Sequence, residues 1–183
     1  MTKKVCKFFE LIGKHTGFDR GDTKFRAFLG AHLERKHTTY PRFMNYFQEV
    51  WDDYIKNDVG INLSRFFIEN GKAFMKKWYT DVFPFPKRRI DFEFKQGGSQ
   101  VDVLITIKYQ LTEVELECLN EIIQKYQIKD KTINAAALIA LLEPCVLLGM
   151  ALSKLIGQEI RVSIEDRSIE KNLITLELSV RPR

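Results

Sequence analysis

The residues that most often carry out catalysis or bind metals are few in this chain and lie far apart. The three histidines, His15, His32 and His37, fall in the first quarter, and no His-x-x-x-His spacing with a carboxylate base accompanies them. The chain contains no Gly-x-Ser-x-Gly turn. The pair Gly97-Gly98 joins two predicted strands, whereas a phosphate-binding loop opens a helix. We therefore expect no catalytic residue, no metal site, no cofactor and no enzymatic activity, although the sequence leaves open a triad assembled in space.

The three cysteines and one glutamate need separate interpretations. Cys6, Cys118 and Cys145 are odd in number and widely spaced, and the last two fall on apolar helical faces. Small buried side chains are therefore a better interpretation of them than a disulfide or a metal site. Glu143 lies inside an apolar helix, where functional acids are sometimes found. A neighbouring donor or a polar rim would satisfy it equally, and its role stays open.

Positive charge is concentrated near the N-terminus. Residues 1–44 carry ten Lys and Arg against four Asp and Glu, and the whole chain has a net charge of +5. One interpretation is a surface that follows nucleic-acid phosphates, and the other is a solvated face over a phenylalanine-rich core. Lys87-Arg88-Arg89 also fits a role that protects a strand edge from pairing. The predicted basic surface consists of Lys4, Lys7, Arg26, Arg35, Lys36, Arg42, Arg88 and Arg89.

Helical periodicity dominates the first half of the chain and alternation follows it. The spacing of apolar residues predicts helices over Lys3–Lys14, Thr23–Lys36, Pro41–Asn57 and Asn62–Val82. Strict alternation then predicts a hairpin of Arg89–Lys95 and Val101–Tyr109 around a glycine turn. Thr112 and Glu115 have the spacing of a capping box, which opens a helix over Glu113–Tyr126.

The apolar stretch Ile133–Gly157 is predicted to be a long buried helix. Alternating segments at Ile160–Glu165 and Leu173–Val180 follow it and form a second hairpin. Two amphipathic hairpins need a common partner. The fold class is therefore α+β, with N-terminal helices and two β-hairpins that form a four-stranded antiparallel sheet packed on the long apolar helix.

That helix could also be considered as a membrane span. Glu143 near its centre and Pro144 both disfavour this, and we expect no span. The N-terminus lacks the apolar core of a signal peptide, so we expect a cytoplasmic protein. With 183 residues, we expect a single domain, with a basic helical part over residues 1–60 and an α+β core over residues 61–183.

From about residue 62 to residue 180 the chain resembles a superfamily of ligand-binding domains. The similarity rests on Gly71–Phe74 with Trp78 and Val82-Phe83-Pro84, on the strand ending in Tyr109, and on Leu148–Val162 with Asn172–Val180. This superfamily includes haem-nitric oxide/oxygen-binding domains, 4-vinyl reductase type domains and TRAPP subunits. The resemblance implies a non-enzymatic binding or sensor domain, or a protein-interaction domain.

Two differences from that pattern argue against haem. Where the haem-binding branch has Tyr-x-Ser-x-Arg, this chain has Tyr109-Gln110-Leu111-Thr112-Glu113, and residues 38–183 contain no histidine. We therefore expect a domain that binds an apolar small molecule, a protein partner or a second copy, with nucleic-acid binding as the alternative. The candidate pocket residues, each of which is more often plain core than a ligand contact, are Phe92, Phe94, Ile105, Tyr109, Cys145, Leu148 and Met150.

Overall fold

The computed structural model describes residues 2–14, 39–57, 62–98, 103–127 and 134–182. The predicted helix Thr23–Lys36 lies outside them, and for the long apolar helix the side chains are described from Ala140 onward. The described elements, in chain order, are α1 (Thr2–Gly13), α3 (Thr39–Asn57), α4 (Leu63–Lys77), η1 (Trp78–Val82), β1 (Ile90–Gln96), β2 (Val103–Gln110), α5 (Glu113–Lys125), α6 (Asn134–Ile156), β3 (Ile160–Glu170) and β4 (Leu173–Pro182).

The two predicted hairpins join in one antiparallel sheet with the order β1-β2-β4-β3. The central pair, β2 and β4, sets Ile105 opposite Leu178 and Ile107 opposite Leu176. The inward-facing residues of these strands are buried and their alternate neighbours are more exposed, as the sequence pattern predicts. The α+β fold class is therefore confirmed, and β1 and β3 are the edge strands of the described sheet.

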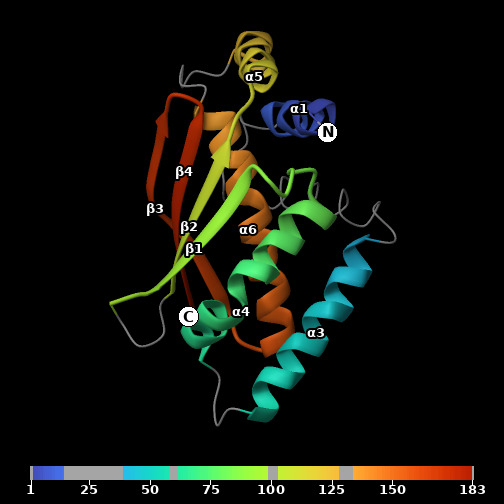
Figure 1. Ribbon diagram of the computed structural model, residues 1–183, viewed down its shortest axis with the longest axis vertical. Helices are drawn as coiled ribbons and strands as arrows, with labels where there is room; N and C mark the ends of the chain where they lie inside the picture. The colour runs from blue at the N-terminus through green and yellow to red at the C-terminus, as the bar shows by residue number, and fades with distance from the viewer. Residues whose placement is uncertain (1, 15–38, 58–61, 99–102, 128–133, 183) are drawn as a thin grey trace.

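Two helices cover the inner face of the sheet. α6 packs against β3 and β4, while α4 packs against β1 (Figure 1). Glycines allow both close approaches. A Cβ built at Gly149 of α6 would lie 2.9 Å from Cγ2 of Val162, and one built at Gly71 of α4 would lie 2.7 Å from the ring of Phe94. The long apolar helix α6 therefore covers only part of the inner face of the sheet, and α4 covers the remaining part.

A proline in the middle of α6 is stabilised by the neighbouring π-helical turn. Pro144 has no amide hydrogen, so it breaks the regular hydrogen-bond ladder of the helix. Trp78 donates from its indole Nε1 to the Pro144 carbonyl at 2.8 Å, and the Tyr79 hydroxyl donates to the Leu141 carbonyl. Both rings are fully buried. The π-turn lets two consecutive residues reach α6, and it fixes that helix under the sheet.

Candidate functional site

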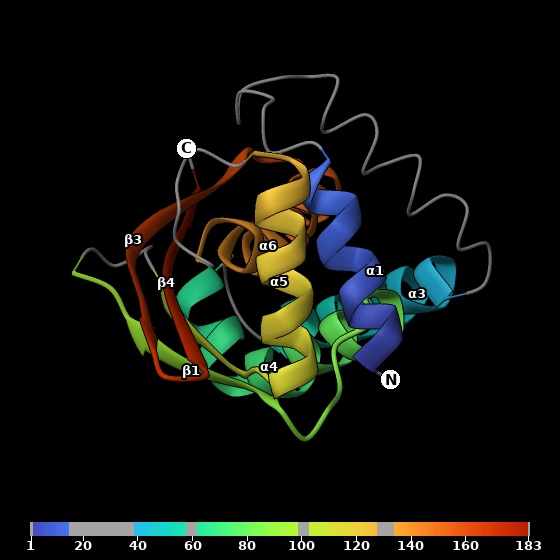
Figure 2. The same ribbon diagram turned by 90° about the horizontal axis from the view of Figure 1, so that it is seen from above.

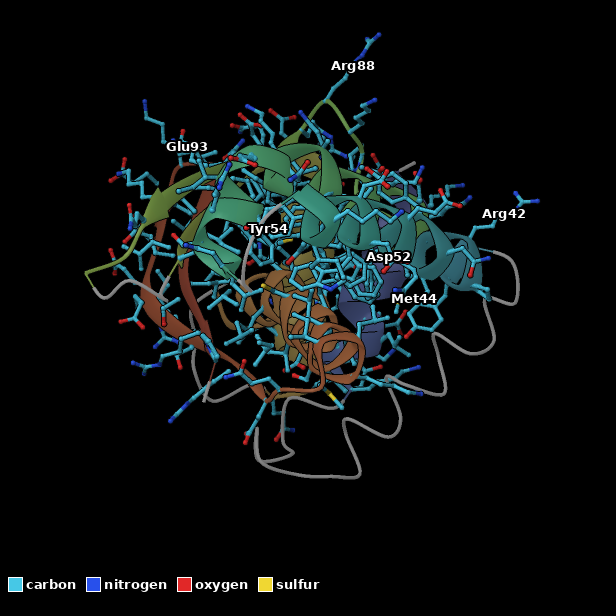
Figure 3. All side chains as sticks on the ribbon, turned by 90° about the horizontal axis from the view of Figure 1, so that it is seen from below. Arg42, Met44, Asp52, Tyr54, Arg88 and Glu93 are labelled. Atoms are coloured by element: carbon cyan, nitrogen blue, oxygen red, sulfur yellow. The ribbon has the colours of Figure 1, made fainter. Side chains whose placement is uncertain are left out.

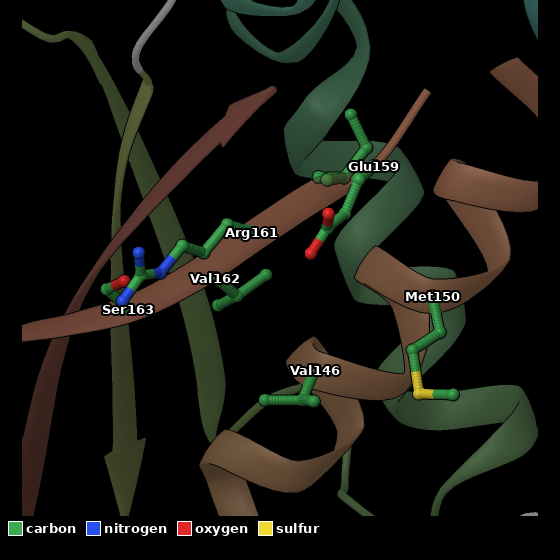
Figure 4. A pocket seen from close by; sticks show the side chains of 7 residues that line it. Val146, Met150, Glu159, Arg161, Val162 and Ser163 are labelled. Carbon is green, nitrogen blue, oxygen red and sulfur yellow. The ribbon is translucent and has the colours of Figure 1, made fainter. Parts of the chain in front are cut away.

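The most open apolar surface in the described part of α6 lies where that helix meets β3. α6 is apolar on nearly all sides, so apolar residues also lie on its outward face. Met150 on that face is 48% exposed. Val146, one turn earlier, is half-buried, and so is Val162 on β3. These three side chains converge in Figure 4. Exposed apolar side chains beside an edge strand mark this place as a candidate interaction surface.

These side chains line a groove of about 420 Å³. Its wall on one side is α6, and its wall on the other side is the first half of the edge strand β3. Arg161 and Glu159, which are both exposed, contribute charge. The complete lining consists of Val146, Met150, Glu159, Ile160, Arg161, Val162 and Ser163. The groove therefore has a mostly polar lining with a few apolar side chains, Val146, Met150 and Val162 among them.

A local hydrogen-bond network fixes the chain between α6 and β3. Ser153 Oγ donates to the Gly149 carbonyl at 2.7 Å and accepts from the Ile160 amide at 2.8 Å. Gly157, at φ +73°, adopts the left-handed conformation that commonly ends a helix. β3 therefore begins in a defined position against α6, and the groove is built into the fold.

The predicted pocket residues do not all lie together. Six belong to the core between helices and sheet: Phe94 is half-buried there, and Phe92, Ile105, Tyr109, Cys145 and Leu148 are buried. The ring of Phe92 lies 5.2 Å from that of Tyr79, and the ring of Tyr109 lies 5.1 Å from that of Phe85. Met150 alone lies on the outer side of α6, in the groove. A ligand role for the six core residues stays a prediction.

The other groove residues were missed by the sequence analysis. Glu159 and Ser163 lie in a stretch that was interpreted only as the start of a strand. No local signal was available, because nothing in an apolar helix shows which of its residues, such as Met150, faces outward. Without the strand order, the sequence could not place β3 at an edge.

A second polar cluster lies at the end of β2 and fixes α5 to the sheet. The carboxylate of Glu115 is fully buried and accepts two hydrogen bonds from the Arg89 guanidinium, at 2.5 and 2.9 Å. It also accepts from the Tyr109 hydroxyl at 3.2 Å and from the Thr112 amide at 3.0 Å, which confirms the predicted capping box. The hydrogen bond to Glu115 raises the pKa of Arg89, and burial raises the pKa of Tyr109.

Arg89 is therefore not a free member of the predicted basic surface. Its side chain is 21% exposed and both of its terminal nitrogens are used by Glu115. Arg89 was grouped with Lys87 and Arg88 because they are consecutive, and the sequence could not show the carboxylate on α5; its role in a basic surface stays a prediction.

The remaining basic residues are spread over separate elements. Lys4 and Lys7 are exposed on α1, and Arg42 is exposed at the start of α3. Arg88 and Arg42 project from distant parts of the molecule in Figure 3. Arg26, Arg35 and Lys36 lie outside the described residues. Nucleic-acid binding by this set stays a prediction.

Buried groups in the core have no evident chemical reactivity. Burial raises the pKa of the Cys145 thiol to about 12 and raises the pKa of Tyr79 well above its usual range. Glu143 is 6% exposed and close enough to Tyr79 to contribute to that shift. Thiolate chemistry at neutral pH is therefore disfavoured at Cys145.

Among the described residues, no group of three or more His, Cys, Asp or Glu side chains is arranged to hold a metal ion. None of the described helices combines the length and apolarity that a bilayer crossing requires.

Comparisons with known proteins give one kind of similarity. No protein-family model matches the chain, and no curated protein matches it. Among solved structures, it is similar to a doubly substituted Tt H-NOX protein (TM-score 0.41, 11% identity, 97% of this chain and 86% of that chain). A structure from work on H-NOX activation has a TM-score of 0.37 and 12% identity, covering 100% and 92%. An oxygen-binding H-NOX domain related to soluble guanylate cyclases has a TM-score of 0.34 and 12% identity, and the match covers 97% of this chain and 86% of that chain.

All three of these structures are H-NOX proteins, one of the branches that the sequence resemblance includes. TM-scores and identities this low decide neither a family nor a function for this chain.

Proposed function

We propose that this protein is a non-enzymatic protein-interaction module that binds a second copy of itself through the α6–β3 groove and the outer edge of β3, which no other described strand pairs with. The observation that supports this most strongly is the position of Met150, 48% exposed in a groove whose other wall is an edge strand. An edge strand presents backbone donors and acceptors that can pair with another strand. A groove beside it adds a place for side chains.

The sequence of β3 favours pairing with itself. If two copies of β3 run antiparallel around Ser163, Val162 of one copy lies opposite Ile164 of the other. The same register brings Arg161 near Glu165, which lies at the register shift in β3 and whose carboxylate also accepts from Ser179 Oγ. A twofold axis repeats each pair, so that one patch is complementary to itself. Cross-strand apolar and opposite-charge pairs each contribute about 0.2–1 kcal/mol.

The α6 side of the groove supports the same occupant. Val146 and Met150 border β3 on its inner side, and the twofold operation that pairs the strands brings the partner's β3 next to them. The register between β3 and β4 shifts between Ile164 and Asp166, which ends the regular part of the outer edge. The proposed contact is therefore short and centred on the groove.

We further propose that the module functions without haem. None of the described residues is a histidine. The Tyr109 hydroxyl, at the place where the resemblance expects contact with haem propionates, donates instead to the buried carboxylate of Glu115. The space next to Tyr109 holds the ring of Phe85, at 5.1 Å between centroids. These residues do not fit a haem.

The test is sedimentation equilibrium of the full chain and of matched variants. We expect the wild type to dimerise and the variant Met150→Lys to shift strongly toward monomer. The variant Ile68→Lys is the matched control, because Ile68 is 50% exposed on α4 and is not part of the groove lining. We expect it to dimerise like the wild type.

A charge exchange tests the register itself. Arg161→Glu and Glu165→Arg should each weaken the dimer, because each brings like charges near one another. The double variant R161E/E165R should restore it. A wild type that stays monomeric at its highest soluble concentration would overturn the proposal, and so would a dimer that none of these variants weakens.

A further inference from the structure

Helices α1 and α5 are packed side by side at one end of the molecule, as Figure 2 shows. Their contact is close. A Cβ built at Gly13 of α1 would lie 2.4 Å from Cγ2 of Ile122 on α5. Next to it, Glu10 accepts hydrogen bonds from Lys125 at 2.9 Å and from Tyr126 at 3.3 Å. The absence of a side chain at Gly13 therefore lets the two helices approach at this point.

The helical repeat extends this contact toward two cysteines. Cys6 precedes Glu10 by one helical turn, and Cys118 precedes Ile122 by one turn, so each cysteine lies on the contacting face of its helix. Cys6 lies close enough to Cys118 to contribute to the raised pKa of the Cys118 thiol. They come from positions 6 and 118, which the sequence gives no reason to pair.

We propose that Cys6 and Cys118 are a redox-active thiol pair that closes to an intramolecular disulfide between α1 and α5. Both cysteines are free and only partly buried, so a small oxidant can reach them. Cys145, the third free cysteine, is 2% exposed on α6 and has no such access. The pair is independent of the α6–β3 groove, so this proposal and the dimer proposal can fail separately.

The oxidant is a small disulfide, and the reaction is two successive exchanges. The Cys6 thiolate attacks the small disulfide, its S–S bond breaks, and one thiolate leaves. The Cys118 thiolate then attacks the sulfur of Cys6, and the second small thiolate leaves. The two protons lost by the cysteines go to the two leaving thiolates. The protein is oxidised by two electrons, and the small disulfide is reduced to two thiols.

The environment of Cys118 sets the order of these steps. Burial and the contact with Cys6 raise the pKa of the Cys118 thiol to about 12. Since the thiolate is the attacking species, Cys118 is a poor first nucleophile at neutral pH. We therefore assign the first attack to Cys6. The second step should be slower and should accelerate as pH rises.

Closing the disulfide would fasten α1 to the rest of the fold. α1 is otherwise bound through its apolar face, where Phe8 lies 5.6 Å from the ring of Phe83 and 5.8 Å from that of Phe85. A covalent link at Cys6 would hold this face in place even when thermal motion loosens the apolar contact. The oxidised protein should therefore resist separation of α1 more strongly than the reduced protein.

The test is oxidation of the full chain with oxidised glutathione, followed by acid quenching and mass spectrometry. We expect a glutathione adduct on Cys6 to form first, and then a product that lacks two hydrogen atoms relative to the reduced chain. Digestion without reduction should yield one linked pair of peptides containing Cys6 and Cys118. Dithiothreitol should reverse the change, and the melting temperature should rise on oxidation and fall on reduction.

Three variants complete the experiment. Cys6→Ser and Cys118→Ser should each abolish the product that lacks two hydrogens, and Cys6→Ser should also abolish the early adduct. Cys145→Ala is the matched control and should close the disulfide like the wild type. A glutathione adduct that persists at high pH would overturn the proposal. So would a product linked between two chains, or one that requires Cys145.

Discussion

The buried ion pair between Arg89 and Glu115 offers a test of the fold at a single residue. The change is Arg89→Met, which keeps the length of the side chain and removes its charge. Glu115 is fully buried, so the variant leaves a carboxylate with no cation beside it. Loss of one partner from a buried pair costs about 3–5 kcal/mol. The variant also loses the stacking of Arg89 over the ring of Tyr109, at 5.4 Å.

Lys108→Met is the matched control for this prediction. Lys108 pairs with Glu93 at 2.5 Å, but both side chains are largely solvated, at 39% and 48% exposed. Removing an exposed pair costs at most about 1 kcal/mol. The assay is urea unfolding of both variants and the wild type, with the free energy of unfolding taken at unchanged slope. If the free energy of unfolding of Arg89→Met lies within about 1 kcal/mol of the wild-type value, this ion pair does not stabilise the fold as a buried pair.

Three further predictions follow from other contacts. Gly149→Ala should lower the free energy of unfolding by about 1–3 kcal/mol, because its Cβ would press on Val162, whereas Gly98→Ala, with open space around it, should be close to neutral in the same urea assay. Partial burial raises the pKa of Asp91, but Lys72, the Phe92 amide and Lys76 together outweigh it and hold the pKa below 3.8. The stability from these contacts is therefore present above pH 3.8 and is lost as pH falls through the lower folded pKa. Lys72→Met should therefore raise the Asp91 pKa in an NMR titration, and an unchanged pKa would contradict the pairing. Haem titrated into the purified protein should give no Soret band of a bound complex, and a saturable band would contradict the haem-free proposal.

The sequence predicted the elements of the fold well because their patterns are local. Alternation at Ile90–Gln96 and the long apolar run of α6 each depend on neighbouring residues only, and both elements are present. The capping box at Thr112 was predicted for the same reason. Local pattern could not show that α4 also packs under the sheet. This packing depends on Gly71, which lets α4 approach Phe94.

The sequence did not predict which distant residues meet. Cys6 and Cys118 are brought together by the packing of α1 on α5, and no spacing in the chain indicates it. Arg89 was interpreted as part of a basic surface because its buried partner lies 26 positions away. Met150 was placed with the core residues because nothing in an all-apolar helix marks its outward face. Each of these outcomes depends on tertiary contacts rather than on periodicity.

The central claim is that the outer edge of β3 is an interface between two copies. Amide hydrogen exchange at increasing protein concentration tests it most directly, with the other edge strand, β1, as the internal control. We expect that protection of edge-facing amides in Ile160–Ile164 rises with protein concentration, while protection in Ile90–Gln96 stays constant. Exchange in Ile160–Ile164 that does not depend on concentration would contradict it.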